Sequence, residues 1–244
     1  MRIFLRLSVL VLALWTTASW ALPKNDPVPG GVISIALPGN YPRAPKVFFN
    51  KQRVMLLRQS NTWVAVLGLA LNTRPGSHEI LVQPAQGSAF KLPFVVTDKH
   101  YKAEHLNIAN QRQVEPNPQD LKRIESDMAE MNAVFKSWTP SSDTPLPFIK
   151  PAQGPFADNF GLRRFFNQQA RNPHSGIDIR VPEGAPVIAP AAGRVQVTND
   201  YFFNGNTVLI DHGQGLISLF CHLSRIDVKA GDTIQQGQQI GLVG

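Results

Sequence analysis

The architecture of the C-terminal half depends on the segment Asn172-Pro173-His174-Ser175-Gly176-Ile177-Asp178-Ile179, which places an imidazole and a carboxylate four positions apart. In a fully extended chain the two groups would lie about 13 Å apart. Two ligands of one zinc ion, each about 2 Å from the metal, must lie within about 4 Å of each other. The backbone must therefore bend if both bind one ion, and Pro173 and Gly176 favour a turned loop over a helix. A surface turn with solvated side chains is the alternative, because an HxxxD pattern alone is common.

Short strands separated by glycine-containing turns follow this segment. The expected strands are Ala185 to Ile188, Gly193 to Thr198, Thr207 to Asp211, Ile217 to His222, and Thr233 to the end of the chain. This pattern predicts an all-β domain of tight hairpins.

Strand alternation places Phe220 and His222 on one face of their strand and Cys221 and Leu223 on the other. Cys221 and His222 are therefore a poor nucleophile and base pair. Cys221 is interpreted as a small buried apolar residue.

The region from Gly31 to Val96 has the same character, with short apolar or alternating runs between turns. The expected strands are Val32 to Leu37, Lys46 to Phe49, Arg53 to Leu57, Thr62 to Leu67, His78 to Gln83 and Ala89 to Val96. Six strands at this spacing predict a small β-sandwich. His78 and His100 lie near strand ends and are interpreted as surface residues.

A helical connector joins the two β regions. Asn117 is a good N-cap, Pro118 suits the first helical position, and an apolar stripe follows. The stripe consists of Leu121, Ile124, Met128, Met131 and Phe135. We expect it to dock on a domain, with a partner helix or a membrane surface as alternatives. The proline-rich run from Thr139 to Pro147 is interpreted as an extended linker.

The first 21 residues have the features of a secretory signal peptide, with basic Arg2 and Arg6, an apolar run, and small residues before Leu22. An uncleaved anchor is the lesser alternative, and no stable membrane span is expected after cleavage. Without these two arginines, 22 basic and 17 acidic residues leave a net charge of +5. This mildly positive charge suits an anionic cell envelope. The basic residues are scattered and the sequence has no RNA- or DNA-binding motif, so nucleic acid is not expected as a partner. A periplasmic or cell-envelope location is expected, and Cys221 alone cannot form an intramolecular disulfide.

Several collinear segments resemble the lysostaphin/LytM-type zinc endopeptidases. They are Phe160 to Arg163, His174 to Asp178, Pro186 to Val195, Asn204 to Asn206, Ile210 to Gly213, Cys221 to Ser224 and Gly237 to Gly241. The resemblance covers Phe160 to Gly244 and implies an incomplete all-β peptidase domain, with bounds assigned at 148–244. The residues before it are divided into a signal at 1–21, a β-sandwich-like accessory module at 22–100, and a connector and linker at 101–147. The fold class expected for the whole chain is mainly β.

The resemblance also implies roles for residues. His174 and Asp178 would bind Zn²⁺, and His222 would be the catalytic histidine that orients or deprotonates water or steadies the oxyanion. The substrate would be the stem peptides of peptidoglycan. Family analogy suggests Tyr201 and Asn204 as groove residues, and Arg163 is a candidate for binding a substrate carboxylate, although a solvated or paired arginine is the simpler interpretation.

The family pattern continues with an HxH motif that supplies the third zinc ligand, and this sequence stops before it. A truncated chain is therefore expected, and His212 in Asp-His-Gly is a weak substitute ligand because its setting predicts a turn. A catalytically silent binding or regulatory module is the alternative function. A lipoyl-like carrier is a weaker one, suggested by the turns at Lys229 to Asp232 but without a carrier lysine motif.

Overall fold

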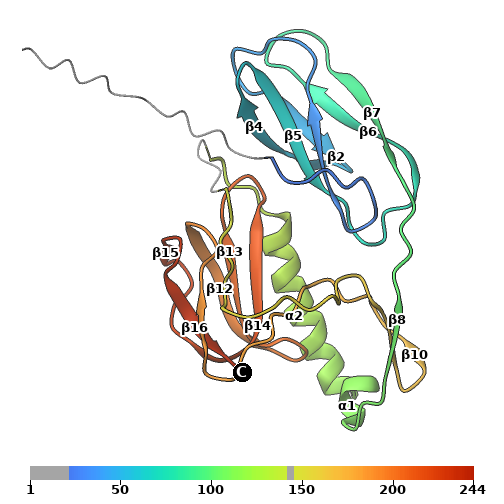
Figure 1. Cartoon of the computed structure of the whole chain (residues 1–244), viewed down its shortest axis with the longest axis vertical. Coiled ribbons are helices and arrows are strands. Elements are labelled where there is room, and N and C mark those ends of the chain that lie inside the picture. Colours follow the sequence, from blue (N-terminus) through green and yellow to red (C-terminus); the bar gives the residue numbers. More distant parts are fainter. Residues whose placement is uncertain (1–21, 142–145) are drawn as a thin grey trace, which may run out of the picture.

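A computed structural model describes residues 22–141 and 146–244 (Figure 1). The signal-peptide prediction for residues 1–21 and the middle of the expected linker lie outside the described residues. The chain is mainly β, as predicted, with an N-terminal β module, a connector that carries both helices, and a C-terminal β domain. Neither helix in these two ranges has the length and apolar character that a membrane crossing requires.

The N-terminal module consists of two antiparallel sheets that share one core, as expected of a sandwich. One sheet has the order β1-β5-β4, formed by Val32–Ala36, Thr62–Gly68 and Met55–Gln59. The other has the order β3-β2-β6-β7, formed by Gln52–Arg53, Lys46–Phe49, Gly76–Gln83 and Phe90–Val96. In β6, Ile80 and Val82 are fully buried while their neighbours are not, because alternate side chains face the core.

The strand expected from Arg53 to Leu57 is instead divided between the two sheets. β3 ends at Arg53, the Val54 amide donates to the Val47 carbonyl, and β4 begins at Met55. The chain thus leaves one sheet and enters the other within a single residue. Alternation of side chains cannot reveal this change, because Val54, at the crossing point, and Leu56 of β4 belong to the same core.

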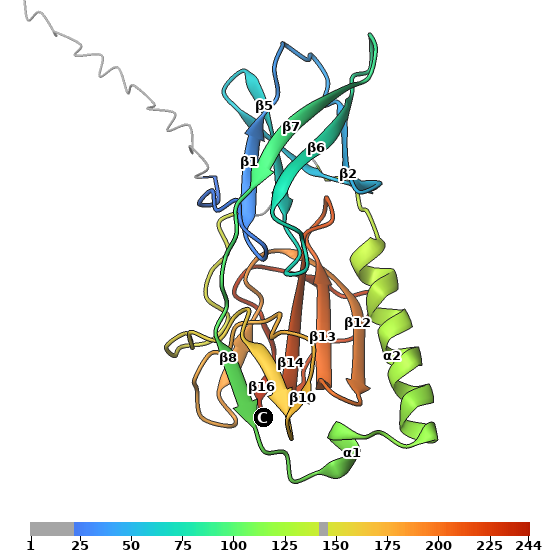
Figure 2. The ribbon, with the colours of Figure 1, turned by 90° about the vertical axis from the view of Figure 1, so that its right-hand side faces the viewer.

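The connector contains β8 (Ala103–Leu106), α1 (Gln111–Val114) and α2 (Pro118–Lys136), and α2 runs along the C-terminal domain (Figure 2). The N-cap prediction is confirmed, since the Asn117 side chain accepts from the amides of Gln119 and Asp120, and Asp120 accepts from the Asn117 amide. Docking is confirmed too, because Val134 packs in the same cluster as the sheet residue Leu209.

The face of α2 that docks is rotated from the predicted stripe. Three stripe members, Leu121, Met128 and Phe135, are 54%, 50% and 46% exposed, whereas Met131 and Val134, which is not in the stripe, pack against the sheet. Polar contacts determine this orientation. The Tyr201 hydroxyl donates to Glu130, and the Phe202 amide donates to Asp127. A count of apolar residues at helical spacing gives no weight to such bonds.

The C-terminal domain is built on a six-stranded antiparallel sheet in the order β11-β16-β14-β13-β12-β15. These strands are Pro186–Ile188, Gln239–Val243, Ile217–Ile226, Gly205–Asp211, Gly193–Tyr201 and Thr233–Ile234. Alternating residues supply two apolar faces. Val208 and Ile210 belong to the inner core of the curled sheet, and Leu209 between them faces α2.

A smaller sheet in the order β10-β9-β8 was not predicted. β9 (Arg163–Phe166) pairs in parallel with β8 from the connector and forms a hairpin with β10 (Gln169–Ala170). Because β8 lies some sixty residues earlier in the chain, local sequence carries no signal for this pairing. The sheet places the connector next to the loop that holds the HxxxD residues (Figure 2).

Candidate metal centre

His174 and Asp178 lie at the two ends of a bend held by backbone hydrogen bonds on both sides. Before the bend, the Gly161 amide donates to the His174 carbonyl (2.7 Å), and the His174 amide donates to the Leu162 carbonyl (3.0 Å). After it, the Ala157 amide donates to the Asp178 carbonyl (2.8 Å). The turned loop predicted from Pro173 and Gly176 is therefore present, and it lies against residues 155–162.

The two side chains face each other. His174 Nε2 lies 3.5 Å from Asp178 Oδ1, within the limit for two ligands that share one zinc ion. His174 Nδ1 lies 3.0 Å from the Asn159 carbonyl, which can only accept, so Nδ1 carries the proton and Nε2 keeps its lone pair. This tautomer is the one that a metal ligand needs. The His174 side chain is 13% exposed and that of Asp178 is 59% exposed, so the pair opens to solvent.

These two donors fit zinc in chemistry and spacing. Within residues 22–141 and 146–244, however, no group of three or more His, Cys, Asp or Glu side chains is arranged to hold one ion. A catalytic zinc needs three protein ligands and an open position. His174 and Asp178 could supply two of these donors.

His222 lies on β14 at an irregular point of the sheet. Its φ is +58°, and its amide donates to the Asn204 carbonyl (2.8 Å). The pairing of β14 with β13 shifts register at this point, and its pairing with β16 shifts just after Leu223. A residue that interrupts the ladder in this way re-aims its side chain, as β-bulges near functional sites do. The His222 ring is exposed.

Because of the same irregularity, the predicted alternation of side chains along this strand is wrong at its end. Phe220 and Leu223 were expected on opposite faces, yet both pack into the inner core of the sheet. The alternation is wrong after Phe220 because His222 adopts a left-handed backbone conformation that resets the face.

The Cys221 thiol, predicted to be buried, is only partly buried. Burial raises the pKa of the Cys221 thiol, and the nearby Asp178 carboxylate adds to this. The raised pKa keeps the group a thiol at neutral pH, which agrees with the exclusion of Cys221 as a nucleophile. Asp178 therefore lies within electrostatic range of the Cys221 thiol.

The three predicted substrate residues occupy different positions. Asn204 lies beside His222 and donates through Nδ2 to Cys221 Sγ (3.0 Å). Arg163 is exposed, and its Nε donates to the Tyr101 carbonyl (3.1 Å), which ties it to the connector. Tyr201 is only 1% exposed under α2, and its hydroxyl donates to Glu130 (2.7 Å). Its buried ring leaves no surface for a substrate, so we withdraw Tyr201 from the predicted contacts.

His212, the proposed substitute ligand, is a buried structural histidine. Nδ1 lies 2.8 Å from the Ala192 carbonyl and Nε2 lies 2.8 Å from Ser218 Oγ, so both ring nitrogens are engaged. Burial lowers the pKa of His212, which keeps the ring neutral. Neither nitrogen is free for a metal.

Asn159 is the residue near the centre that sequence reasoning missed. Besides its carbonyl contact with His174, its Nδ2 donates to Asp178 Oδ2 (2.5 Å) and its Oδ1 accepts from the Asp178 amide (3.2 Å). Its position before Phe160-Gly161 is a weak signal, because no spacing rule links it to residues fifteen and nineteen positions later.

Comparison with known proteins agrees with this architecture. Residues 172–244 match the sequence model of peptidase family M23, and residues 25–99 match that of the M23 N-terminal domain. A crystal structure of a Pseudomonas aeruginosa protein assigned to peptidase M23 superposes with a TM-score of 0.75 at 40% identity, covering 90% of this chain and 84% of that one.

Among curated proteins, the chain is 39% identical over 89 residues to the peptidoglycan DD-endopeptidase ShyA of Vibrio cholerae, covering 36% of this chain and 21% of that protein. It is 42% identical over 73 residues to a metalloprotease of Haemophilus influenzae, covering 30% of this chain and 15% of that protein. The chain thus spans about a fifth or less of the length of these curated relatives.

Proposed function

Because this chain belongs to peptidase family M23, we propose that it is an exported zinc metalloendopeptidase that hydrolyses peptide cross-links of peptidoglycan during cell-wall remodelling. The observation that carries the proposal is the paired donor geometry, with His174 Nε2 at 3.5 Å from Asp178 Oδ1. The similarity to peptidoglycan DD-endopeptidases of Vibrio cholerae supports the substrate class. The signal-like N-terminus supports an envelope location, where that substrate is found.

His174 and Asp178 would hold the ion, and the Asn159 carbonyl keeps His174 in the required tautomer. Zinc, if bound by these residues, would supply Lewis acidity toward the amide carbonyl and would lower the pKa of the attacking water. His222, exposed on the strand that passes Asp178, would accept a proton from the attacking water or donate a hydrogen bond to the developing oxyanion. Asn204 fixes the backbone of His222 through its carbonyl.

Two variants separate metal binding from proton transfer. We expect His174→Ala to lower both the zinc affinity and the rate of hydrolysis by more than about 100-fold. This exceeds the effect of removing a residue that only contacts a metal ligand. We expect His222→Ala to keep its zinc and to lose about 10² to 10⁴ in turnover, as removal of a general acid or base does. Release of soluble muropeptides from purified sacculi, with zinc content measured in parallel, checks both results.

The matched control is His100→Ala, which removes an exposed histidine outside the site and should leave both readouts unchanged. Activity that persists after exhaustive removal of zinc would contradict the proposal. Sequencing the coding region beyond codon 244 tests the regulatory alternative, since an HxH pair there would supply the third donor and a stop codon would favour a catalytically silent module.

A further inference from the structure

Asn159 contacts both proposed zinc ligands, and it does so with three separate groups. Its backbone carbonyl faces His174 Nδ1 (3.0 Å), its amide nitrogen donates to Asp178 Oδ2 (2.5 Å), and its amide oxygen accepts from the Asp178 backbone (3.2 Å). Few single residues could orient an imidazole and a carboxylate together in this way. We propose that Asn159 is the positioning residue of the metal centre, an inference that rests on the proposed function.

The contacts of Asn159 leave one atom of each ligand free, and those two atoms face each other. The carbonyl occupies His174 Nδ1, so only Nε2 can bind a metal. The amide occupies Asp178 Oδ2, so Oδ1 is the oxygen that faces Nε2 at 3.5 Å. An Asp178 without this bond would rotate freely, since its side chain is 59% exposed. Asn159 thereby leaves Oδ1 as the carboxylate oxygen presented toward His174 Nε2.

The backbone segment that carries Asn159 is itself packed against Tyr101 of the connector. Gly161 has a φ of +81°, and a Cβ at this position would collide with the Tyr101 ring. Tyr101 also packs edge-on against Phe160, and its hydroxyl donates to the Pro29 carbonyl of the N-terminal module (2.7 Å). The segment is therefore clamped between the HxxxD loop and the connector. A clamped segment can impose a geometry on its partners, whereas a mobile one would follow them.

Two substitutions at Asn159 test the proposal. Asn159→Ala removes the side-chain bonds to Asp178 and keeps the carbonyl contact with His174, and Asn159→Leu does the same at nearly constant volume. We expect each variant to bind zinc about 10- to 100-fold more weakly, as loss of an outer-shell partner does. Competition with a chromophoric zinc chelator gives the affinity, and the visible spectrum of the Co²⁺ form reports ligand geometry.

Asn167→Ala is the matched control. The Asn167 side chain also makes two hydrogen bonds to backbone, to the amide (2.8 Å) and the carbonyl (3.1 Å) of Ile108, but it contacts neither ligand. We expect this variant to lose stability while keeping the parental zinc affinity and Co²⁺ spectrum. Near-ultraviolet circular dichroism establishes that each variant is folded.

The outcomes distinguish the inference from the function on which it rests. Folded Asn159 variants with zinc affinity within twofold of the parent and an unchanged Co²⁺ spectrum would overturn the positioning role alone. A parent that binds zinc no better than His174→Ala would overturn the zinc assignment and, with it, this inference. Weaker binding and an altered spectrum in both Asn159 variants, with Asn167→Ala unaffected, would support it.

Discussion

A single buried imidazole links the stability of the C-terminal domain to pH. His212 is 4% exposed, its ring nitrogens contact Ala192 and Ser218, and the Asp211 carboxylate lies nearby. Burial lowers the pKa of His212 below its ordinary value of about 6.5. The unfolded chain therefore takes up a proton at a higher pH than the folded chain. The stabilisation is complete above the unfolded pKa and is lost as pH falls through the folded pKa.

We expect the free energy of unfolding of the parent to fall between pH 7.5 and pH 5.5, and His212→Gln to show a flatter dependence because it cannot take up this proton. Urea denaturation at the two pH values measures the difference. His100→Gln, which alters an exposed histidine, should keep the parental slope. Equal slopes for the parent and His212→Gln would show that the buried imidazole does not set the pH response.

Helix α2 depends on the cap at its first turn. Asn117 and Asp120 satisfy each other's free backbone amides, and Arg112 pairs with the Asp120 carboxylate. This hydrogen bond from Arg112 lowers the pKa of Asp120, which keeps the carboxylate charged at the positive end of the helix dipole. The cap fixes where α2 begins, and hence which residues face Tyr201 and Leu209.

We expect Asn117→Ala to lower the free energy of unfolding by about 1 kcal/mol, since the helix loses its N-cap. Asn132→Ala makes the same substitution at an exposed mid-helix position and should raise stability by a few tenths of a kcal/mol through helix propensity. Chemical denaturation followed by far-ultraviolet circular dichroism compares the two. A change of the same sign in both variants would contradict the capping role.

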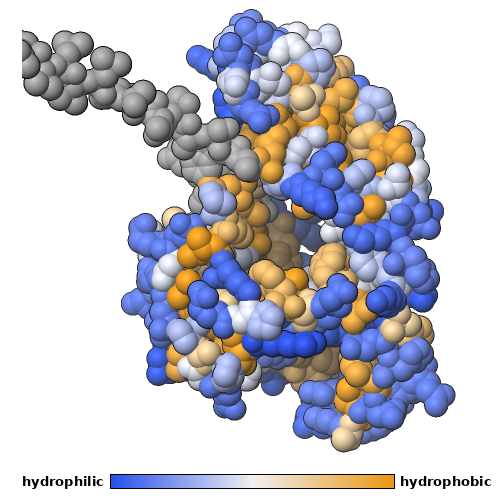
Figure 3. Space-filling view, in the orientation of Figure 1, coloured by the Kyte–Doolittle hydropathy of each residue, from blue (hydrophilic) through white to orange (hydrophobic). Residues whose placement is uncertain are grey.

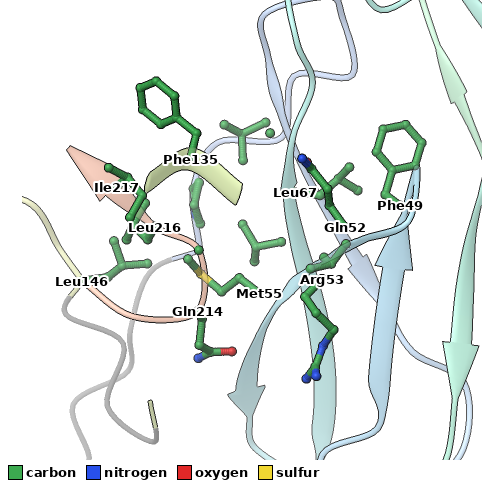
Figure 4. Close-up of a pocket in the computed structure, with 16 residues that line it drawn as sticks. Phe49, Gln52, Arg53, Met55, Leu67, Phe135, Leu146, Gln214, Leu216 and Ile217 are labelled. Carbon is green, nitrogen blue, oxygen red and sulfur yellow. The ribbon is translucent and has the colours of Figure 1, made fainter. Parts of the chain in front are cut away.

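A side-chain contact joins the N-terminal module to the turn between β13 and β14 of the C-terminal domain. Gln214 Oε1 accepts from the Leu56 amide (3.0 Å) and Gln214 Nε2 donates to the Leu56 carbonyl (3.2 Å), so one side chain pairs with the open edge of β4. Beside it lies a cavity of about 430 Å³, where Met55 lies near Leu216 at the base of β14 (Figure 4). Apolar residues gather where the module meets the rest of the molecule (Figure 3).

We expect Gln214→Asn to detach the edge of β4 from this turn. Asn tolerates the left-handed backbone of residue 214 (φ +52°), but its amide is one methylene too short to reach Leu56. Hydrogen exchange of the β4 amides should therefore become faster, by about fivefold for each kcal/mol by which the free energy of local opening falls. Gln59→Asn, at an exposed position of β4, should leave the exchange of Leu56 unchanged. Unaltered protection of Leu56 in Gln214→Asn would show that this side chain does not hold the module.

Prediction from sequence succeeded where the signal is local. The strand from Lys46 to Phe49 and the cap at Asn117 follow from alternation and from capping chemistry, and both have the expected bounds. Prediction failed where a residue far away in the sequence determines the local structure. β8 is a four-residue, mostly exposed strand whose one sheet partner among the described residues is β9. The exposed flank of α2 follows from polar groups such as the Tyr201 hydroxyl on β12.

The sequence by itself determined the mainly β architecture, the family, and the pairing of His174 with Asp178, because periodicity and motif order are properties of neighbouring residues. Only the tertiary structure placed Asn159 against both donors and buried Tyr201 beneath α2. It also placed both ring nitrogens of His212 within hydrogen-bonding distance of Ala192 and Ser218. These outcomes depend on which segments meet after folding, and contacts between residues far apart in the chain leave no periodic trace in one sequence.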